Sequence, residues 1–285
     1  MTPPDPRIFH AWPVILSGIC LLGSFAVISR IYRDIQRRDQ SGASSSRCMD
    51  VCNWSLGDIG MILGWTVFVY SQAALLGMLF GRLKIFRGPE GHAFFMLTTG
   101  VLIYAVMVAL IARLLRRKKL TWGKAFGFQT GPWFGILAGV GASFVALIAP
   151  YVLAGFATNC FFKFCGWEIE PQPILEIIGK LRNPWLLGGM GALALVGAPI
   201  VEELFFRGVL YPCLKKRVGR AHSLWMTSAI FAEFHFHLPG FLPLFVLGAI
   251  FTILYEWKGN LLACILCHSL FNALSLCFLF FQGKG

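Results

Sequence analysis

Long apolar segments recur along the whole of this 285-residue chain, and they constrain its fold more than any other feature. An α-helix needs about 20 residues to cross the apolar core of a bilayer. Hydrophobic residues make up 57% of the sequence and charged residues 13%, too few polar side chains for the surface of a water-soluble domain. We therefore predict an all-α, polytopic membrane bundle of about eight transmembrane helices. The predicted helices are 12–28, 59–80, 93–112, 132–157, 185–210, 222–238, 241–256 and 260–281.

The basic residues predict how the helices are oriented. Sixteen of the 25 lysines and arginines follow the first, third, fifth and seventh predicted helices. The positive-inside rule places these connections in the cytoplasm and both termini on the opposite side. The segment 12–28 is expected to be a permanent helix, because only Arg7 precedes it as a basic residue and no small-residue cleavage site follows. The expected location is an integral, multi-pass one, in the plasma membrane if the source is bacterial.

Ionisable residues are distributed unevenly between the two halves of the chain. The first four predicted helices carry almost none at depth, whereas the last four carry several glutamates and histidines. We therefore divide the chain into residues 1–125, with about three transmembrane helices and basic loops, and residues 126–285, where we expect the chemistry. The net charge of +12 does not indicate nucleic-acid binding, because the basic residues form short runs between apolar segments.

The fifth predicted helix contains three charged side chains in a stretch of six residues: Glu202, Glu203 and Arg207. A charge at membrane depth costs at least ~2.5 kcal/mol, so it is rare without a partner or a function. Glu203 and Arg207 are four residues apart and share a helix face, which predicts an ion pair. Glu202 points about 100° away, and Pro199 is expected to weaken the backbone ladder so that Glu202 faces a cavity. A buried network that only joins helices would also account for these charges.

Two further helices each carry a histidine with a second side chain of interest at helical spacing. Phe231 and His235 are four residues apart on the sixth predicted helix, and His268 and Asn272 are four apart on the eighth. Each pair therefore projects from one side of its helix. Taken separately, such residues are also consistent with ordinary hydrogen bonding between helices, worth ~1 kcal/mol.

Together, the patterns E-E-x-x-x-R, F-x-x-x-H and H-x-x-x-N resemble the CPBP family of intramembrane proteases, also called Abi. That family includes the type II CAAX prenyl endopeptidases and bacteriocin self-immunity proteins. The resemblance covers roughly residues 130–281, and residues 1–120 show nothing specific to the family. The matching residues are Glu202, Glu203 and Arg207, then Phe231 and His235, then His268 and Asn272.

The resemblance implies a role for each of these residues. Glu202 and His235 would activate a water molecule, and His268 and Asn272 would stabilise the oxyanion of a tetrahedral intermediate. These residue types suit peptide hydrolysis, which needs a base for the water and donors aimed at the developing negative charge. Structural support would come from Glu203, Arg207 and Phe231.

A metal-dependent mechanism is the rival interpretation. Glu202, His235 and His268 are ligand types that zinc accepts, and a water would complete a tetrahedron. However, the sequence lacks the H-E-x-x-H motif, and it also lacks the rhomboid G-x-S-G and presenilin-like G-x-G-D signatures. We therefore expect no required cofactor, with a divalent metal such as zinc as the alternative.

The leading functional hypothesis is an intramembrane endopeptidase that cleaves a membrane-anchored peptide or protein, as in CAAX processing. The alternative is a non-proteolytic scaffold or bacteriocin self-immunity protein, in which the polar cluster only holds the bundle together. A proton-coupled transporter is a third class, disfavoured because the sequence shows no inverted repeat. The expected partners are the lipid bilayer and a membrane-associated substrate, with no nucleic acid.

Overall fold

The computed structural model describes residues 53–80, 88–128, 133–169 and 173–282, together with the single positions 30, 33 and 37. This part of the chain is helical and contains no strand. The first predicted helix, 12–28, lies outside it. In chain order the elements are α3 (Leu56–Phe80), α4 (Gly88–Arg117), α5 (Trp122–Phe126), α6 (Trp133–Cys165), α7 (Pro173–Lys180), α8 (Pro184–Ala192), η3 (Leu193–Gly197), α9 (Ala198–Phe205), η4 (Phe206–Leu210), α10 (Tyr211–Glu233), η5 (Leu238–Gly240), α11 (Phe241–Lys258) and α12 (Leu261–Gln282).

Six helical stretches within the described residues are long and apolar enough to cross a membrane. Five of them correspond to the predicted helices on α3, α4, α6, α11 and α12. The polytopic helical bundle is therefore confirmed, and the chain is an integral, multi-pass membrane protein.

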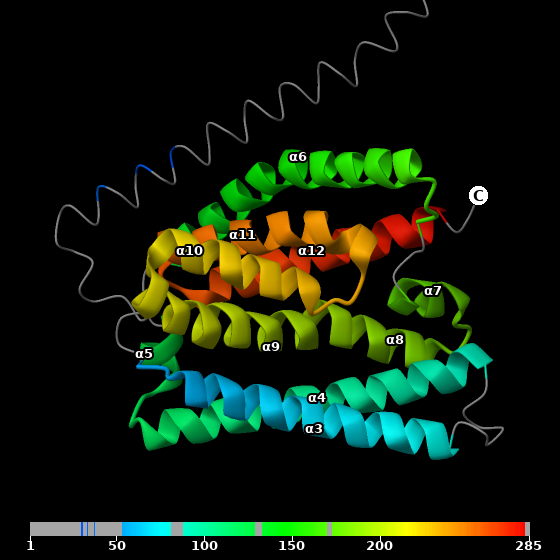
Figure 1. Ribbon diagram of the computed structural model, residues 1–285, viewed down its shortest axis with the longest axis horizontal. Helices are drawn as coiled ribbons and strands as arrows, with labels where there is room; N and C mark the ends of the chain where they lie inside the picture. The colour runs from blue at the N-terminus through cyan, green and yellow to red at the C-terminus, as the bar shows by residue number, and fades with distance from the viewer. Residues whose placement is uncertain are drawn as a thin grey trace, which may run out of the picture.

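The remaining stretch runs through 50 residues, from Pro184 to Glu233. It contains the predicted helices 185–210 and 222–238, which are separated at Gly219 by non-helical backbone angles (φ 79°, ψ 172°). Glycine accepts this positive φ without the steric penalty of a Cβ atom. Figure 1 shows α10 turning back at this point to run beside α11, the helix against which it packs most extensively.

The predicted range 222–238 was wrong at its C-terminal end. The helix stops at Glu233, and Phe236 then adopts a positive φ of 47° before the short 3-10 turn η5 begins at Leu238. Apolar residues continue past Glu233, so their pattern alone did not mark the end of the helix.

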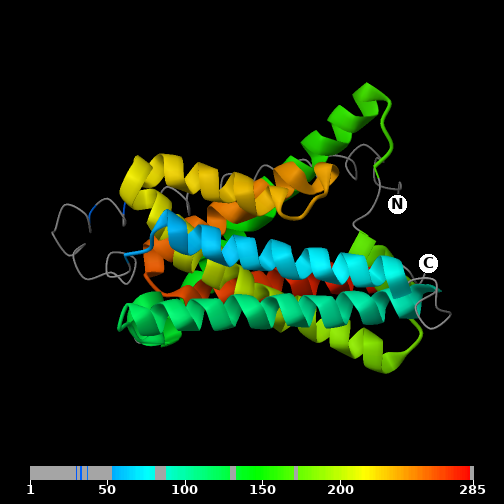
Figure 2. The ribbon, with the colours of Figure 1, turned by 60° about the horizontal axis from the view of Figure 1, so that its bottom comes forward.

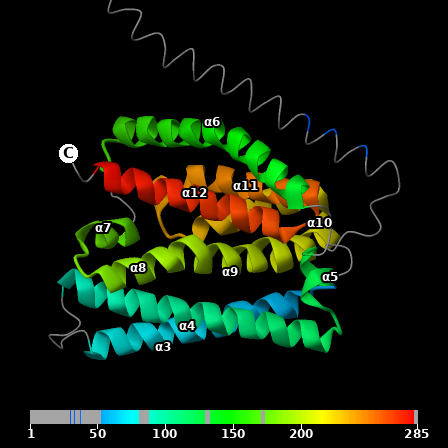
Figure 3. The ribbon, with the colours of Figure 1, turned by 180° about the vertical axis from the view of Figure 1, so that it is seen from behind.

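The helices pack in layers, as Figures 1 and 3 show from opposite sides. The α8–α9 run lies between the antiparallel pair α3 and α4 on one side and α11 and α12 on the other, with α6 outermost. Figure 2 shows α3 and α4 lying side by side along their length. The central position of α9 brings it into contact with α4 on one side and α12 on the other.

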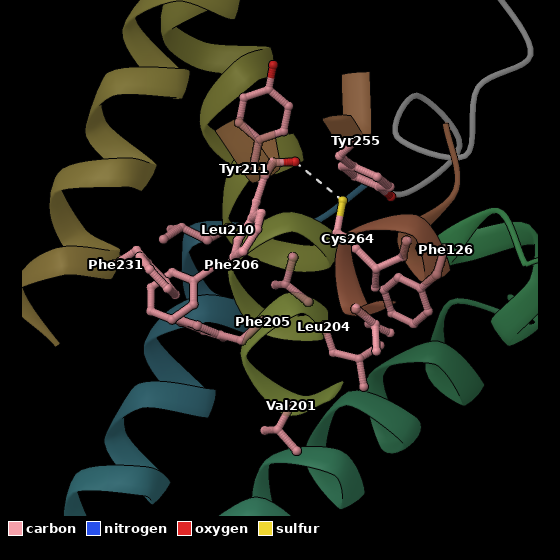
Figure 4. Packing of buried hydrophobic residues seen from close by; sticks show 14 of the residues in the cluster. Phe126, Val201, Leu204, Phe205, Phe206, Leu210, Tyr211, Phe231, Tyr255 and Cys264 are labelled. Atoms are coloured by element: carbon pink, nitrogen blue, oxygen red, sulfur yellow. Dashed lines mark hydrogen bonds between the residues drawn. The ribbon is translucent and has the colours of Figure 1, made fainter. Parts of the chain in front are cut away.

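The main buried cluster surrounds α9 and η4, and Figure 4 shows part of it. Phe126 of α5 packs so closely on Gly208 that a Cβ atom there would lie 2.5 Å from its ring. The cluster also includes Ile111 of α4 and Leu261 of α12. Buried residues thus come from both sides of the proposed boundary at residue 125 and share one core, while the functional division at that boundary stays a prediction.

Charged contacts join several elements at the end of the bundle that holds α5 and the Gly219 turn. Asp58 of α3 pairs with Lys118, just after α4, at 2.9 Å. Glu256 of α11 is buried and accepts hydrogen bonds from Tyr211 and Lys215, and its other oxygen lies 3.4 Å from Nε of Arg220. Glu256 therefore connects α11 to both sides of the Gly219 turn.

Candidate active site

The two adjacent glutamates of α9 have different surroundings. The side chain of Glu203 is completely buried, whereas that of Glu202 retains 21% exposure. Successive residues of a helix diverge by about 100°, so the two carboxylates cannot point into the same space. The sequence-based separation of their roles is compatible with this difference in environment.

Glu203 forms the centre of a buried polar network. Its Oε1 atom accepts hydrogen bonds from Nη1 of Arg207 at 2.9 Å, which is the predicted i,i+4 ion pair, and lies 2.9 Å from Nδ1 of His268. The second terminal nitrogen of Arg207 donates to the backbone carbonyl of Gly248 on α11 at 2.9 Å. The network therefore ties α9, η4, α11 and α12 together at one point.

Three aromatic rings enclose the guanidinium group of Arg207. Its central carbon lies 4.6 Å from the ring centre of Phe231, 5.3 Å from that of Phe251 and 5.9 Å from that of Phe206. A cation near an aromatic ring is attracted by the ring quadrupole, and more strongly when water is absent. The motif residue Phe231 thus contributes to the support of Arg207, and its ring also lies near the imidazoles of His235 and His268, with centres at 4.8 and 6.1 Å.

Glu202 faces α4, a helix that carries none of the three sequence motifs. The Tyr104 hydroxyl of α4 donates to Oε1 of Glu202 at 3.4 Å. The other oxygen, Oε2, is buried without a hydrogen-bond partner and lies 4.0 Å from Nε2 of His268. The expectation that the chemistry lies in the second half of the chain stays a prediction, but Tyr104, which contacts Glu202, belongs to the first half and gave no charge or motif signal.

A π-helical turn, η3, precedes Pro199 and sets the position of Asn272. Within η3 the backbone bonds reach back five residues, as from the N–H of Ala198 to the carbonyl of Leu193. In that register Pro199 would bond to the Ala194 carbonyl, but proline has no N–H. The carboxamide of Asn272 donates to this carbonyl instead, at 2.8 Å. The predicted weakening of the ladder at Pro199 is confirmed, and it attaches α12 to the helix that carries Glu202.

His235 lies just beyond the end of α10, not on the helix as predicted. Its Nδ1 atom is 2.8 Å from the backbone carbonyl of Phe231. A carbonyl can only accept a hydrogen bond, so Nδ1 carries the hydrogen and Nε2 of the neutral ring has a free lone pair. Among the contacts of the described residues, no hydrogen bond or ion pair joins His235 to Glu202, whereas His268 lies within 4.0 Å of Glu202.

The proposed zinc ligands do not converge in this arrangement. Within the described ranges, no three histidine, cysteine, aspartate or glutamate side chains form a group able to hold a metal ion. Glu202, His235 and His268 have suitable donor atoms for zinc, but they are not gathered around one point.

Comparison with known families agrees with the three motifs. Residues 184–274 match the family model described as "Type II CAAX prenyl endopeptidase Rce1-like". This confirms, for that part of the chain, the resemblance based on the motifs, all of whose residues it contains. Tyr104 lies outside the matched segment.

A curated relative covers a similarly limited part of the chain. "Uncharacterized protein YpbD" of Bacillus subtilis (strain 168) is 33% identical over 85 residues, which are 28% of this chain and 41% of the relative's length. The chain thus spans less than half the length of that relative. No solved structure matches the chain significantly.

Proposed function

We propose that this chain, whose residues 184–274 match the type II CAAX prenyl endopeptidases, is an intramembrane endopeptidase acting on a membrane-associated peptide or protein. The observation that carries the proposal is the placement of Glu202: its side chain keeps 21% exposure, and its Oε2 atom has no hydrogen-bond partner among the described residues and lies 4.0 Å from Nε2 of His268. Buried polar atoms are normally hydrogen-bonded, and unpaired carboxylates at membrane depth are costly. This oxygen is therefore suited to bind a water or a reacting substrate group.

In the proposed reaction, Oε2 of Glu202 accepts a proton from water while the water oxygen attacks the carbonyl carbon of the substrate. His235 assists as a second base, and the proton taken from the water passes to the leaving amine as the carbon–nitrogen bond of the substrate breaks. The hydrogen bond from its Nδ1 to the Phe231 carbonyl leaves its Nε2 lone pair available to accept a proton. Such proton transfer is the usual requirement for making water nucleophilic at neutral pH.

The oxyanion of the intermediate would be stabilised by Asn272 and His268. The carboxamide nitrogen of Asn272 has two hydrogens and uses one for the Ala194 carbonyl, so the second is available to the oxyanion. His268 donates from Nδ1 to Glu203, and it donates from Nε2 as well when doubly protonated. A donor aimed at developing negative charge contributes most in a site of low dielectric constant.

Tyr104 acts in this scheme as a positioning residue. Its hydroxyl bonds to Oε1 of Glu202 and so leaves Oε2 as the oxygen that receives the proton. The distance of 3.4 Å is long for this type of bond, but catalytic hydrogen bonds are often long before substrate binds. Glu203 and Arg207 hold the backbone of the same helix in place.

The substrate class follows from the family match alone: we infer a CAAX-processing-like cleavage close to the membrane, with no prenyl group assumed. A scaffold or immunity protein would need the polar cluster only to hold helices together. The partial exposure of Glu202 favours the enzyme, because a carboxylate that only holds helices together can be completely buried, as Glu203 is, whereas a base must be reached by water and substrate.

The test is Glu202→Gln, which keeps the shape of the side chain and removes the base. We expect processing of a membrane-anchored reporter to fall at least a hundredfold, within the range that general-base catalysis contributes, with unchanged folding in detergent. Full processing by the folded variant would contradict the assignment and favour the scaffold. Loss of wild-type processing after exhaustive chelation would instead support the metal alternative.

A further inference from the structure

A hollow of about 600 Å³ lies between α3 and α4, away from the candidate active site. Its apolar part includes Trp65 of α3 and Leu110 of α4, and its polar part is formed by Arg113, Arg116 and Arg117. Leu110 and the three arginines follow one another along the axis of α4, and the arginines lie nearest its C-terminal end. The hollow is therefore apolar toward the centre of the bundle's length and basic toward one end.

The three arginines are available to a ligand. Among the described residues none of them forms an ion pair. Asp58, the acidic residue at this end of α3, is already bound by Lys118 at 2.9 Å and by the backbone N–H of Ser55 at 2.8 Å. The positive charge of the hollow is thus left without a counter-charge from its own helices.

The apolar part continues along α3 into a second hollow of about 390 Å³, which shares Trp65 and includes Phe68. Gly60 and Gly64, one helical turn apart, also line it, and a Cβ atom at either would have no neighbour within 4 Å. Trp65 and Phe68 are both about half exposed. Because the two glycines have no side chains, the surface of α3 is recessed beside two exposed aromatic rings. This recess leaves room for an acyl chain.

We propose that the hollow between α3 and α4 is a binding site for one anionic phospholipid. The phosphate would lie among Arg113, Arg116 and Arg117, and an acyl chain would follow the apolar surface past Trp65. Basic pockets between transmembrane helices at the cytoplasmic side attract anionic head groups, and each nearby arginine adds to the attraction. Planar guanidinium groups also bind phosphate through paired hydrogen bonds.

Other occupants fit the hollow less well. The chain's own segment before residue 53 carries six arginines and four aspartates, so it would bring a further net positive charge to the hollow. A second copy of the chain, with a net charge of +12, has the same disadvantage. Free phosphate would use the arginines but leave the apolar half uncovered.

The test uses the full-length protein in nanodiscs and lipids with brominated acyl chains, which quench tryptophan fluorescence on contact. We expect brominated phosphatidylglycerol to quench at about tenfold lower mole fraction than brominated phosphatidylcholine. The preference should weaken as salt is added, because salt screens charges near the surface. Trp65→Phe should remove the lipid-selective part of the quenching, which identifies the site among the chain's nine tryptophans.

Matched variants separate a site from general surface charge. Arg113→Gln/Arg117→Gln should weaken phosphatidylglycerol binding about tenfold. Lys119→Gln/Lys124→Gln removes the same charge from the connection after α4 and from α5, and it should change binding less than twofold. Equal losses in both, or equal quenching by the two lipids, would overturn the proposal. Displacement by soluble glycerol phosphate would also overturn it, in favour of a phosphate site. If the arginine variant does not fold, Arg113→Lys/Arg117→Lys should retain the preference.

Discussion

Adjacent glutamates can carry different tasks in this chain because a helix rotates by about 100° per residue. Glu203 is turned toward Arg207 and His268, where two donors share one of its oxygens. Glu202 is turned toward Tyr104, and its side chain keeps 21% exposure. At the scale of single residues, the site consists of a neutralised, buried support beside a carboxylate that is still able to react.

Arg207→Ala is expected to destabilise the protein by about 3–5 kcal/mol, because it leaves the buried carboxylate of Glu203 without its cation. A matched control is Lys180→Ala, which breaks an exposed pair with Glu176 at the same i,i+4 spacing. That pair should contribute less than about 1 kcal/mol. Thermal unfolding in detergent measures both, and equal melting temperatures for the two variants would contradict the supporting role of Arg207.

Tyr104→Phe is expected to lower kcat about tenfold with little change in KM, the effect of losing one hydrogen bond to a charged group. Tyr151→Phe is the control, because this hydroxyl has no hydrogen bond among the described residues and its ring packs on Phe271. Tyr104→Phe should have no further effect in a Glu202→Gln background. An additional loss in that background would mean that Tyr104 acts on the structure and not through Glu202.

At the scale of elements, prolines and glycines decide how the helices approach one another. The π-helical turns η3 and η4 each end immediately before a residue pair that contains proline, Ala198-Pro199 and Tyr211-Pro212. The first of these frees a carbonyl for Asn272. π-Turns of this kind are rare and occur frequently at functional sites, which agrees with their position on either side of Glu202.

Close packing at Gly248 brings α11 against α10 and presents a carbonyl to Arg207. A Cβ atom at Gly248 would lie 3.1 Å from the Ser228 backbone and 3.2 Å from the Phe231 ring. We expect Gly248→Ala to destabilise the protein by about 1–3 kcal/mol, as overpacking generally does. Gly141→Ala, where no atom lies within 4 Å, should not lower the melting temperature. If both substitutions are neutral, the two helices tolerate separation at this point.

At the scale of the whole molecule, the two halves of the chain share one core and one candidate site. α4 packs on α8, η3 and α9, and Gly100 and Gly189 allow that approach, since a Cβ atom at either would lie within 3 Å of a leucine on the facing element. The family match begins only at residue 184. The N-terminal helices are therefore part of the structure around Glu202, although they carry none of the family motifs.

The bundle also predicts where the C-terminus lies. α12 runs away from the end that holds α5 and the Gly219 turn, as Figure 1 shows. With that basic end in the cytoplasm, the C-terminus should be on the opposite side. In a bacterial host, alkaline phosphatase fused to the C-terminus should be active, and a fusion within the connection 118–121 should be inactive. The reverse pattern would contradict the orientation.

Much of the architecture was predictable from the sequence because membrane helices must be long and apolar, and because i,i+4 spacing is local. The spans, the Glu203–Arg207 pair and the weak ladder at Pro199 follow from these rules. The three motifs also named the residues that the family match contains, although their catalytic roles stay predictions.

Contacts between distant segments were decided only by the tertiary structure. Tyr104 reaches Glu202 across 98 positions, and a tyrosine in an apolar helix gives no sign of such a partner. The end of α10 before His235 is marked by backbone geometry and not by a change in hydropathy. Local sequence records the face of a helix on which a residue lies, whereas the element that this face meets depends on how all the helices pack together.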